Sequence, residues 1–466
     1  MSFLFIVPFA LLVLQALNGL GCSLDYDELY SFHYFMSKDS LRDVLCAYRM
    51  FNNHLGYSAL AWFCRMGLGS AEWVLRLPAL AFALGALGLT WSWVRKNFGM
   101  KAAFLSSLLL VLSPEFVRYS YAARGYSGLL CLTLLSTIVF LRLLKNPRRL
   151  DFALYVLIAV AAIYVHLYSV CVVGVQLLML GRLGAQRHAA PWISWTMVFL
   201  SIGVLSFLCY LPVLESFMGA VQLRGQGPWN PGFVLESFAY LSGRTSGAET
   251  FFWMGLAGAG LWPLWKRDRL LAVYLGLLFT VPLALVIVLH PWDLYHRFFF
   301  FLLPYYVLLI ALGLAQTVRF VGSYSSGRVR QGIGVLGSAV LLALLADGAK
   351  VQWQRAEEIR YREVIRALEE GASPETALAA VGRNAEMLEY YFTRPWHSPK
   401  TLEELLTLAK ASDGIHCVYH EITWNSPGEQ EIRAYLCEHA QMRRMNWMSL
   451  FYMDAGDVTD AADTHG

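Results

Sequence analysis

Long apolar stretches recur along the first three quarters of the chain and stop near residue 350. Eleven of them approach the length of about 20 residues that a helix needs to cross a bilayer. They lie at 3–20, 73–94, 101–117, 125–144, 152–167, 169–183, 192–213, 250–265, 270–289, 298–318 and 332–348. The pattern predicts an α-helical polytopic membrane protein with about 11 transmembrane helices. The first helix lacks the basic segment of a signal peptide, and we expect it to be retained because the chain that follows it is also membrane-like.

The last quarter of the chain has shorter and more polar segments. The apolar spacing predicts helices over Gln352–Glu370 and Ala377–Glu389, and a strand over Ile415–Tyr419. Such an alternation is typical of a small α/β domain. Cys417 and Cys437 are plausible disulfide partners in it, and two unpaired thiols are equally compatible with the sequence.

Composition separates the same two parts of the chain. Hydrophobic residues make up 57% and charged residues only 15% of the whole, whereas soluble domains carry about a quarter charged residues. Residues 350–466 hold 12 Lys/Arg and 19 Asp/Glu, and residues 1–349 hold 25 and 14. We therefore expect a transmembrane domain at 1–349 and a soluble α/β domain at 350–466, and the sequence offers no support for nucleic-acid binding.

Basic residues gather in alternate loops between the apolar stretches, and such loops are retained in the cytoplasm. They are Arg95, Lys96, Lys101, Arg142, Lys145, Arg148, Arg149, Arg182, Arg187, Lys266, Arg267, Arg269, Arg319, Arg328 and Arg330. This register predicts a cytoplasmic N-terminus and, after eleven spans, an extracytoplasmic C-terminal domain in a cytoplasmic or inner membrane. Of the acidic residues of 1–349, it leaves only Asp151 and Asp268 inside.

An acidic cluster of Asp25, Asp27 and Glu28 follows the first apolar stretch, at its outer end. A carboxylate that is partly desolvated beside a like charge has a raised pKa and can take a proton from a sugar hydroxyl. The alternative is a solvated cluster that caps a helix.

Two long outer segments accompany this cluster. Residues 22–72 contain Lys38–Arg49, whose apolar spacing suits an amphipathic helix on the membrane surface. Residues 214–249 contain a Gly/Pro-rich run around Trp229, which is a candidate for stacking on a sugar. Loops of this length in compact proteins are usually functional or mobile.

Basic, imidazole and tyrosine side chains, together with one aspartate, stand at the other outer ends of the apolar stretches. Arginines there can clamp a phosphate through planar donors, although a single arginine more often extends to lipid headgroups. Their occurrence together with acids on one face favours a binding site. The residues are His54, Arg118, Arg124, Tyr126, His166, His290, Asp293, His296 and Arg297.

Several other kinds of site have no signature in the sequence. Nucleotide-binding glycine motifs, a nucleophile elbow and zinc-ligand spacings are missing from it. No cofactor is therefore assigned, and a divalent metal stays an open alternative. A donor used outside the cytoplasm would be a lipid phosphate rather than a nucleotide sugar.

A series of short motifs runs in order over most of residues 1–350. They are Asp27-Glu28-Leu29-Tyr30, Asn53-His54-Leu55-Gly56-Tyr57, Val74-Leu75-Arg76-Leu77-Pro78, Leu112-Ser113-Pro114, Ala123-Arg124-Gly125-Tyr126, His166-Leu167-Tyr168 and Arg297-Phe298. In these the chain resembles the GT-C superfamily of membrane glycosyltransferases, in the group with aminoarabinose transferase, protein O-mannosyltransferases and lipopolysaccharide-core galacturonosyltransferases. Members move a sugar from a polyprenyl-phosphate carrier to an acceptor on the outer membrane face, usually with inversion.

The resemblance implies a set of site residues. The catalytic Asp of the family matches Asp27, with Glu28 beside it. Substrate or phosphate contacts are implied at His54, Arg124, Tyr126, His166, His296 and Arg297. The chain departs from the family at two places. Family members have prolines after the histidine, which are missing after His54, and they have Gln-Glu before Ala-Arg, where this chain has Tyr121-Ala122.

These observations predict a hexosyl- or pentosyltransferase that uses a polyprenyl-phosphate-linked sugar and a glycolipid, polysaccharide or protein acceptor. Asp27 would act as general base. Two alternatives stay open at this point. A transporter or flippase of a lipid-linked saccharide predicts ionisable residues at mid-membrane depth, and a non-catalytic assembly protein would use the acidic tail to recruit envelope enzymes.

Overall fold

The chain divides into two compact units in the computed structural model. The first consists of Met1–Gly21 and Tyr34–Trp353, and the second of Cys22–His33 and Gln354–Gly466. The acidic segment after the first helix thus groups with the C-terminal residues, which the sequence does not predict. The structure describes residues 3–49, 53–183, 192–222, 230, 232–243, 247–289, 295–323, 343, 361–382, 384–420, 426–445 and 448–453.

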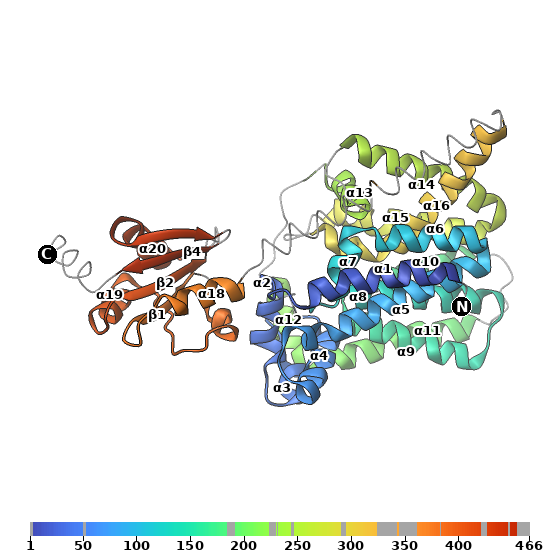
Figure 1. Ribbon diagram of the computed structural model, residues 1–466. Coiled ribbons are helices and arrows are strands. Elements are labelled where there is room, and N and C mark those ends of the chain that lie inside the picture. The colour runs from blue at the N-terminus through green and yellow to red at the C-terminus, as the bar shows by residue number, and fades with distance from the viewer. Residues whose placement is uncertain are drawn as a thin grey trace. The chain divides into compact units, whose positions relative to one another are not determined.

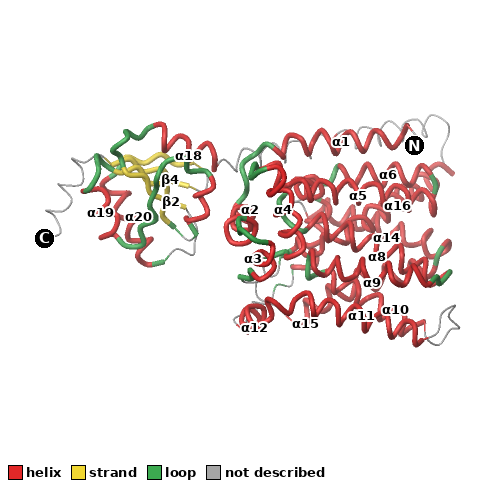
Figure 2. The backbone as a smooth tube through the Cα atoms, turned by 90° about the horizontal axis from the view of Figure 1, so that it is seen from below, coloured by secondary structure: helices red, strands yellow, loops and turns green. Residues whose placement is uncertain are grey.

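Helices make up the first unit in its described residues. They are α1 (Phe3–Leu20), α3 (Leu41–Cys46), α4 (Leu55–Leu68), α5 (Glu72–Phe98), α6 (Met100–Val111), α7 (Pro114–Tyr121), α8 (Tyr126–Lys145), α9 (Arg149–Val165), α10 (Ser169–Leu183), α11 (Trp192–Tyr210), α12 (Leu214–Gln222), α13 (Phe233–Ser242), α14 (Gly247–Arg267), α15 (Arg269–Leu289) and α16 (Leu303–Ser323), with a 3₁₀ helix η4 (His296–Leu302) before α16. Figures 1 and 2 show α1, α5, α6, α8 and α9 running side by side. The eleventh predicted stretch, 332–348, lies outside the described residues except for Ala343.

Some of these helices are long and apolar enough to cross a membrane. Among the described residues these are Glu72–Phe98, Tyr126–Lys145, Ile193–Gln222, Arg269–Leu289 and His296–Phe320. Helices α6 and α7 meet the same length and composition test only together, and they are bent by 68° at the short break between them. The polytopic helical class is confirmed, whereas the predicted number of about 11 spans is not.

The bend between α6 and α7 has its cause in the sequence. Pro114 occupies the first turn of α7, where its fixed φ is favourable and its missing N–H is not needed. It cannot continue α6, so that helix ends at Val111.

A buried arginine holds the end of α1. The Nη1 atom of Arg76 donates hydrogen bonds to the carbonyl oxygens of Gly19 and Leu20, at 2.8 and 3.2 Å. These carbonyls have no partner within their own helix, and a cation at this end also opposes the helix dipole. Arg76 therefore stabilises the point from which the chain leaves the first unit.

A buried network of uncharged polar groups joins five helices in the interior of the first unit. The Tyr155 hydroxyl donates to Gln176 Oε1 at 2.6 Å, and Gln176 Nε2 donates to the Tyr274 hydroxyl at 3.4 Å. Thr137 pairs with Tyr274 and accepts from Tyr305, both at 2.8 Å. Such bonds contribute roughly 0.6 to 2 kcal/mol each between membrane helices.

The predicted amphipathic helix over Lys38–Arg49 is too long. The structure has only α3, which begins after Ser40, and the Ser40 hydroxyl accepts a hydrogen bond from the Asp43 N–H at 3.2 Å. The backbone is already extended at Ala47. Short capped helices of this kind depend on packing, because one or two turns are not stable by themselves.

The second unit confirms the predicted α/β class. Its strands are β1 (Ala377–Val381), β2 (Ile415–His420), β3 (Gln441–Met445) and β4 (Met448–Met453), in the order β1-β2-β4-β3. Strands β1 and β2 are parallel and the other pairs antiparallel. The sheet packs with α18 (Tyr361–Glu370), α19 (Leu402–Lys410) and α20 (Pro427–His439), as Figure 2 shows.

The predicted helix over Ala377–Glu389 is wrong. Residues 377–381 form strand β1, and a 3₁₀ helix, η5 (Ala385–Tyr390), follows it. Alanine favours helices, but the run pairs with β2 and is buried in the sheet, and tertiary burial overrides weak local propensity. The predicted helix over Gln352–Glu370 is present as α18 where the residues are described, and the strand at Ile415 is confirmed.

Two cysteines in the C-terminal part of the second unit are not joined by a disulfide. Cys417 and Cys437 both carry free thiols, the first buried and the second exposed. Of the two arrangements that the sequence allows, the structure therefore has the one without a disulfide.

Candidate active site

Three glycines shape the place where α9 ends. A Cβ atom added to Gly56, Gly125 or Gly128 would lie 3.0, 2.6 or 2.5 Å from an atom of Val165. Only glycine lets the first turns of α4 and α8 approach the last residue of α9 this closely. The residues next to these contacts, in the loops and first turns, are thereby brought together.

Five predicted site residues of the first unit meet at this point. The imidazole centroids of His54 and His166 are 4.4 Å apart, and the Tyr126 ring lies 5.3 and 4.9 Å from them. The guanidinium carbons of Arg124 and Arg297 lie 6.0 and 5.7 Å from the centroid of Tyr126. We call His54, Arg124, Tyr126, His166 and Arg297 the histidine–arginine cluster.

The two imidazoles of the cluster are neutral near pH 7. Burial, and next the positive charge of Arg124, hold the pKa of His54 well below its usual value. Burial with the charges of Arg124 and Arg297 lowers the pKa of His166 to about 3. The positive charge of the cluster therefore comes from its two arginines, and the histidines act as neutral hydrogen-bonding groups.

The neutral His166 ring presents a hydrogen-bond donor that is not used. The Tyr168 backbone N–H donates to His166 Nδ1 at 3.3 Å, which assigns the proton of the ring to Nε2. This Nε2 atom is buried, and no described residue accepts a bond from it. An unsatisfied buried donor costs roughly 1 to 3 kcal/mol. An anionic oxygen bound between the arginines would satisfy it.

His296 faces another helix. Its Nε2 atom lies 3.3 Å from Glu236 Oε2, its Nδ1 atom lies 3.2 Å from Ser237 Oγ, and its ring stacks on Phe233. All three partners belong to α13. Among the described contacts, the structure thus brings Arg297 to the cluster and places its neighbour His296 outside it.

A buried acid near the cluster has no counterpart among the predicted site residues. Glu115 lies in the first turn of α7 with 3% of its surface exposed, and its charge acts on the hydroxyls of Tyr119 and Tyr240. The Tyr240 hydroxyl donates to that of Tyr119 at 3.1 Å, and the Tyr119 ring contacts Tyr126 at 4.5 Å. The signal in the sequence is a carboxylate within an apolar stretch, which is rare without a function.

The acidic cluster lies on α2 (Tyr26–Ser31) in the second unit. Asp25 Oδ1 accepts from the Glu28 N–H, and Glu28 Oε2 accepts from the Asp25 N–H, both at 2.8 Å. This reciprocal capping box satisfies two backbone donors. Asp25 and Glu28 therefore cap α2, as in the alternative that the sequence allows, although Glu28 is buried rather than solvated.

Asp27 has no part in this cap. It is half-buried in the first turn of α2. Burial and the charges of Asp25 and Asp27 raise the pKa of Tyr361 above its usual value. The Tyr361 hydroxyl also pairs with His420 Nε2 at 3.1 Å. Asp27 thus acts on a buried polar pair within the second unit.

Other predicted features cannot be placed. Trp229, His290 and Asp293 lie outside the described residues. In the part of the chain that the structure describes, no three His, Cys, Asp or Glu side chains are grouped as metal ligands would be.

Part of the chain matches a known family. Residues 55–215 match the family of dolichyl-phosphate-mannose-protein mannosyltransferases. The match includes Arg124, Tyr126 and His166 of the cluster, and it begins one residue after His54. No curated protein matches the chain by sequence.

Solved structures share the fold over nearly the whole chain. ArnT from Cupriavidus metallidurans in the apo state has a TM-score of 0.59 at 15% identity, covering 97% of this chain and 98% of ArnT. ArnT bound to undecaprenyl phosphate has a TM-score of 0.61 at 14% identity, with 96% and 97% covered. The archaeal oligosaccharyltransferase AglB from Archaeoglobus fulgidus, in complex with an inhibitory peptide and a dolichol-phosphate, has a TM-score of 0.54 at 11% identity, with 89% and 69% covered.

Proposed function

The chain has the fold of the GT-C superfamily of membrane glycosyltransferases, and from this premise we propose that it transfers a sugar from a polyprenyl-phosphate carrier to an acceptor at the outer membrane face. The family match over residues 55–215 supports this reaction class. So does the structural likeness to ArnT bound to undecaprenyl phosphate and to AglB with a dolichol-phosphate.

In this proposal the histidine–arginine cluster binds the phosphate of the carrier. The unused Nε2–H of His166 is the observation that carries this assignment. This donor lies near two arginines in the interior of the protein, where a charged ligand interacts with them more strongly than it would in water. Arg124 and Arg297 would oppose the negative charge that grows on the phosphate as the sugar leaves, and such electrostatic stabilisation is often the largest catalytic contribution.

Asp27 is proposed as the general base. It takes the proton of the acceptor hydroxyl, whose oxygen bonds to the anomeric carbon while the bond from that carbon to the phosphate oxygen breaks. Free polyprenyl phosphate is the leaving group. Glu28, engaged in the cap of α2, is assigned the positioning of Asp27 rather than a proton transfer.

The base assignment is tested by Asp27→Asn in the full chain, reconstituted with a lipid-linked sugar and acceptor. We expect sugar transfer to fall at least about a hundredfold, because a positioned base contributes about 10² to 10⁴ in rate. Glu215→Gln is the matched control, since it removes an exposed acid in α12. Transfer by Asp27→Asn at nearly the rate of the control would exclude Asp27 as the base.

The same assay separates a transferase from a flippase. A transferase releases free carrier lipid when acceptor is present, whereas a flippase moves the intact lipid-linked saccharide. The buried network of Thr137, Tyr155, Gln176, Tyr274 and Tyr305 favours the transferase, because it is uncharged. A transport path is expected to carry ionisable groups at that depth.

A further inference from the structure

A cavity of about 820 Å³ lies at the other end of the helices of the first unit. Its lining includes Phe98 at the end of α5, Lys101 at the start of α6, and Arg267 and Arg319 close to the ends of α14 and α16. Helix α16 begins directly after η4, which holds Arg297, and 21 helical residues extend about 30 Å. On α16 the cavity lining runs from Ala311 to Arg319, mostly in the second half of the helix, so the cavity and Arg297 of the histidine–arginine cluster lie toward opposite ends of α16.

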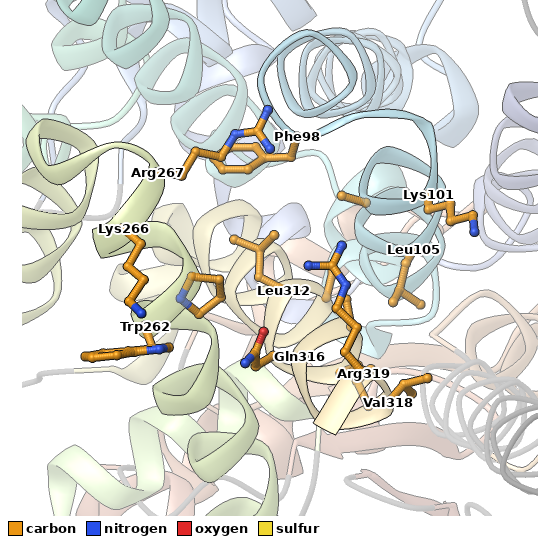
Figure 3. Close-up of a pocket in the computed structure, with 15 residues that line it drawn as sticks. Phe98, Lys101, Leu105, Trp262, Lys266, Arg267, Leu312, Gln316, Val318 and Arg319 are labelled. Atoms are coloured by element: carbon orange, nitrogen blue, oxygen red, sulfur yellow. The ribbon is translucent and has the colours of Figure 1, made fainter. Parts of the chain in front are cut away.

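The lining combines four cationic side chains with large apolar ones. Lys101, Lys266, Arg267 and Arg319 are exposed at the cavity, beside Trp262 and Leu312. The ammonium of Lys266 lies 4.4 Å from the Trp262 ring, and the guanidinium of Arg267 lies 5.4 Å from the Phe98 ring. Figure 3 shows Arg319 reaching into the middle of this group.

The cationic groups have no carboxylate partner among the described residues. Asp151 and Asp268, the acids predicted for this face, are already paired. Asp151 lies 3.1 Å from Arg142, and Asp268 lies 3.0 Å from Lys145. The cavity therefore has four positive charges that no described carboxylate neutralises. Its volume is within the roughly 300 to 1,000 Å³ that is typical of ligand sites.

From this charge and lining we propose that the cavity binds an anionic phospholipid of the leaflet opposite the histidine–arginine cluster. The phosphate headgroup lies among Lys101, Lys266 and Arg319, and the start of an acyl chain lies along Leu312 and Trp262. A soluble anion would use the charges alone, whereas a lipid matches both the basic and the apolar lining. Basic pockets between transmembrane helices are suited to such headgroups.

The test uses the full chain in phosphatidylcholine nanodiscs to which phosphatidylglycerol is added, with bound lipid counted by native mass spectrometry. We expect the wild type to retain one phosphatidylglycerol at this site in preference to phosphatidylcholine. The variant Lys101→Gln/Arg319→Gln should retain it about tenfold to thirtyfold less, since each basic group near the headgroup favours binding by about fivefold. Lys266→Gln alone should give a smaller loss and serves if the double variant unfolds.

Two controls decide what a loss means. Arg95→Gln/Lys96→Gln removes the same charge from exposed positions at the end of α5 that do not line the cavity, and should leave retention unchanged. Arg124→Gln alters the proposed carrier site and should also leave it unchanged, so this inference and the proposed function can fail separately. Equal retention by the double variant and its charge-matched control would overturn the proposal.

The source of the phosphate is decided in the same preparation. Thermal stabilisation of the wild type by inorganic phosphate in pure phosphatidylcholine nanodiscs, equal to that by phosphatidylglycerol, would show a soluble-anion site and overturn the lipid assignment. Stabilisation by phosphatidylglycerol alone supports it.

Discussion

At the scale of single residues, the candidate site depends on two neutral imidazoles held between two arginines. His54 and His166 stay uncharged because they are buried next to Arg124 and Arg297. A bound phosphate would reverse part of this effect, since its negative charge favours the protonated imidazole. The cluster is thus arranged to gain favourable charge contacts when an anion enters.

The depressed pKa of His166 predicts a pH-dependent stability. The unfolded chain takes up a proton on this residue near pH 6.5, whereas the folded chain does so only at about 3. The free energy of unfolding that depends on His166 is therefore fully present above pH 6.5. It is lost progressively as the pH falls from 6.5 toward 3, because only the unfolded chain is protonated there. At pH 5 the loss is about 2 kcal/mol.

The measurement compares unfolding midpoints of the purified protein at pH 7 and pH 5. His166→Gln, which keeps an N–H donor but does not titrate, should lose less stability between these values than the wild type. The same loss in both proteins would contradict the assigned protonation state. Added polyprenyl phosphate should reduce the loss in the wild type.

At the scale of elements, the first unit depends on close helix crossings at glycines. Gly260 of α14 and Gly313 of α16 face each other, and a Cβ on either would overlap the carbonyl oxygen of Leu309 or Leu256. Small residues permit such crossings between membrane helices. The large side chains that line the basic cavity, from Trp262 on α14 and Gln316 on α16, follow directly beyond this crossing.

Gly260→Ala is therefore expected to destabilise the protein by about 1 to 3 kcal/mol, because the added methyl group forces the helices apart. Gly258→Ala is the matched control, since a Cβ there meets nothing within 4 Å. In a helix this control should be neutral or slightly stabilising. Thermal unfolding in nanodiscs compares the two, and equal midpoints would mean that α14 and α16 do not cross at this glycine.

At the scale of the whole molecule, the second unit is built from two distant parts of the chain. The Leu24 N–H donates to the Tyr391 hydroxyl at 2.6 Å, and Asn384 Nδ2 donates to the Tyr26 hydroxyl at 2.7 Å. The Tyr26 ring also packs on His420. The helix that carries Asp27 is thus held by the C-terminal residues, which gives that unit a direct part in placing the proposed base.

Tyr26→Phe should loosen this attachment by about 1 kcal/mol, the usual contribution of one hydrogen bond. Hydrogen exchange of the Leu29 amide, which bonds to the Asp25 carbonyl, should become about fivefold faster. Tyr452→Phe is the control in the same unit, because its hydroxyl forms no hydrogen bond with any described residue and has only the charge of Arg443 near it. Unchanged exchange in Tyr26→Phe would show that this bond does not hold α2.

The sequence alone predicts the helical membrane part, the polar C-terminal part and all five residues of the histidine–arginine cluster. Apolar length and the order of short motifs are local properties, so His54, Arg124, Tyr126, His166 and Arg297 can be named without a structure. Secondary structure is less certain where segments are short. The alanine-rich run after residue 376 is a strand because of its neighbours, which local propensity does not include.

Tertiary structure decides which of these groups meet and what state they are in. Two residues that are adjacent in the sequence have different neighbours in the structure, since His296 contacts α13 whereas Arg297 contacts Tyr126. Glu28 caps α2 and leaves Asp27 as the proposed base. The proton on His166 and the cavity among four basic residues both depend on burial and on contacts between distant segments. The position of a proton and the volume of a cavity depend on the surrounding atoms rather than on residue type. They are therefore decided only when the helices pack.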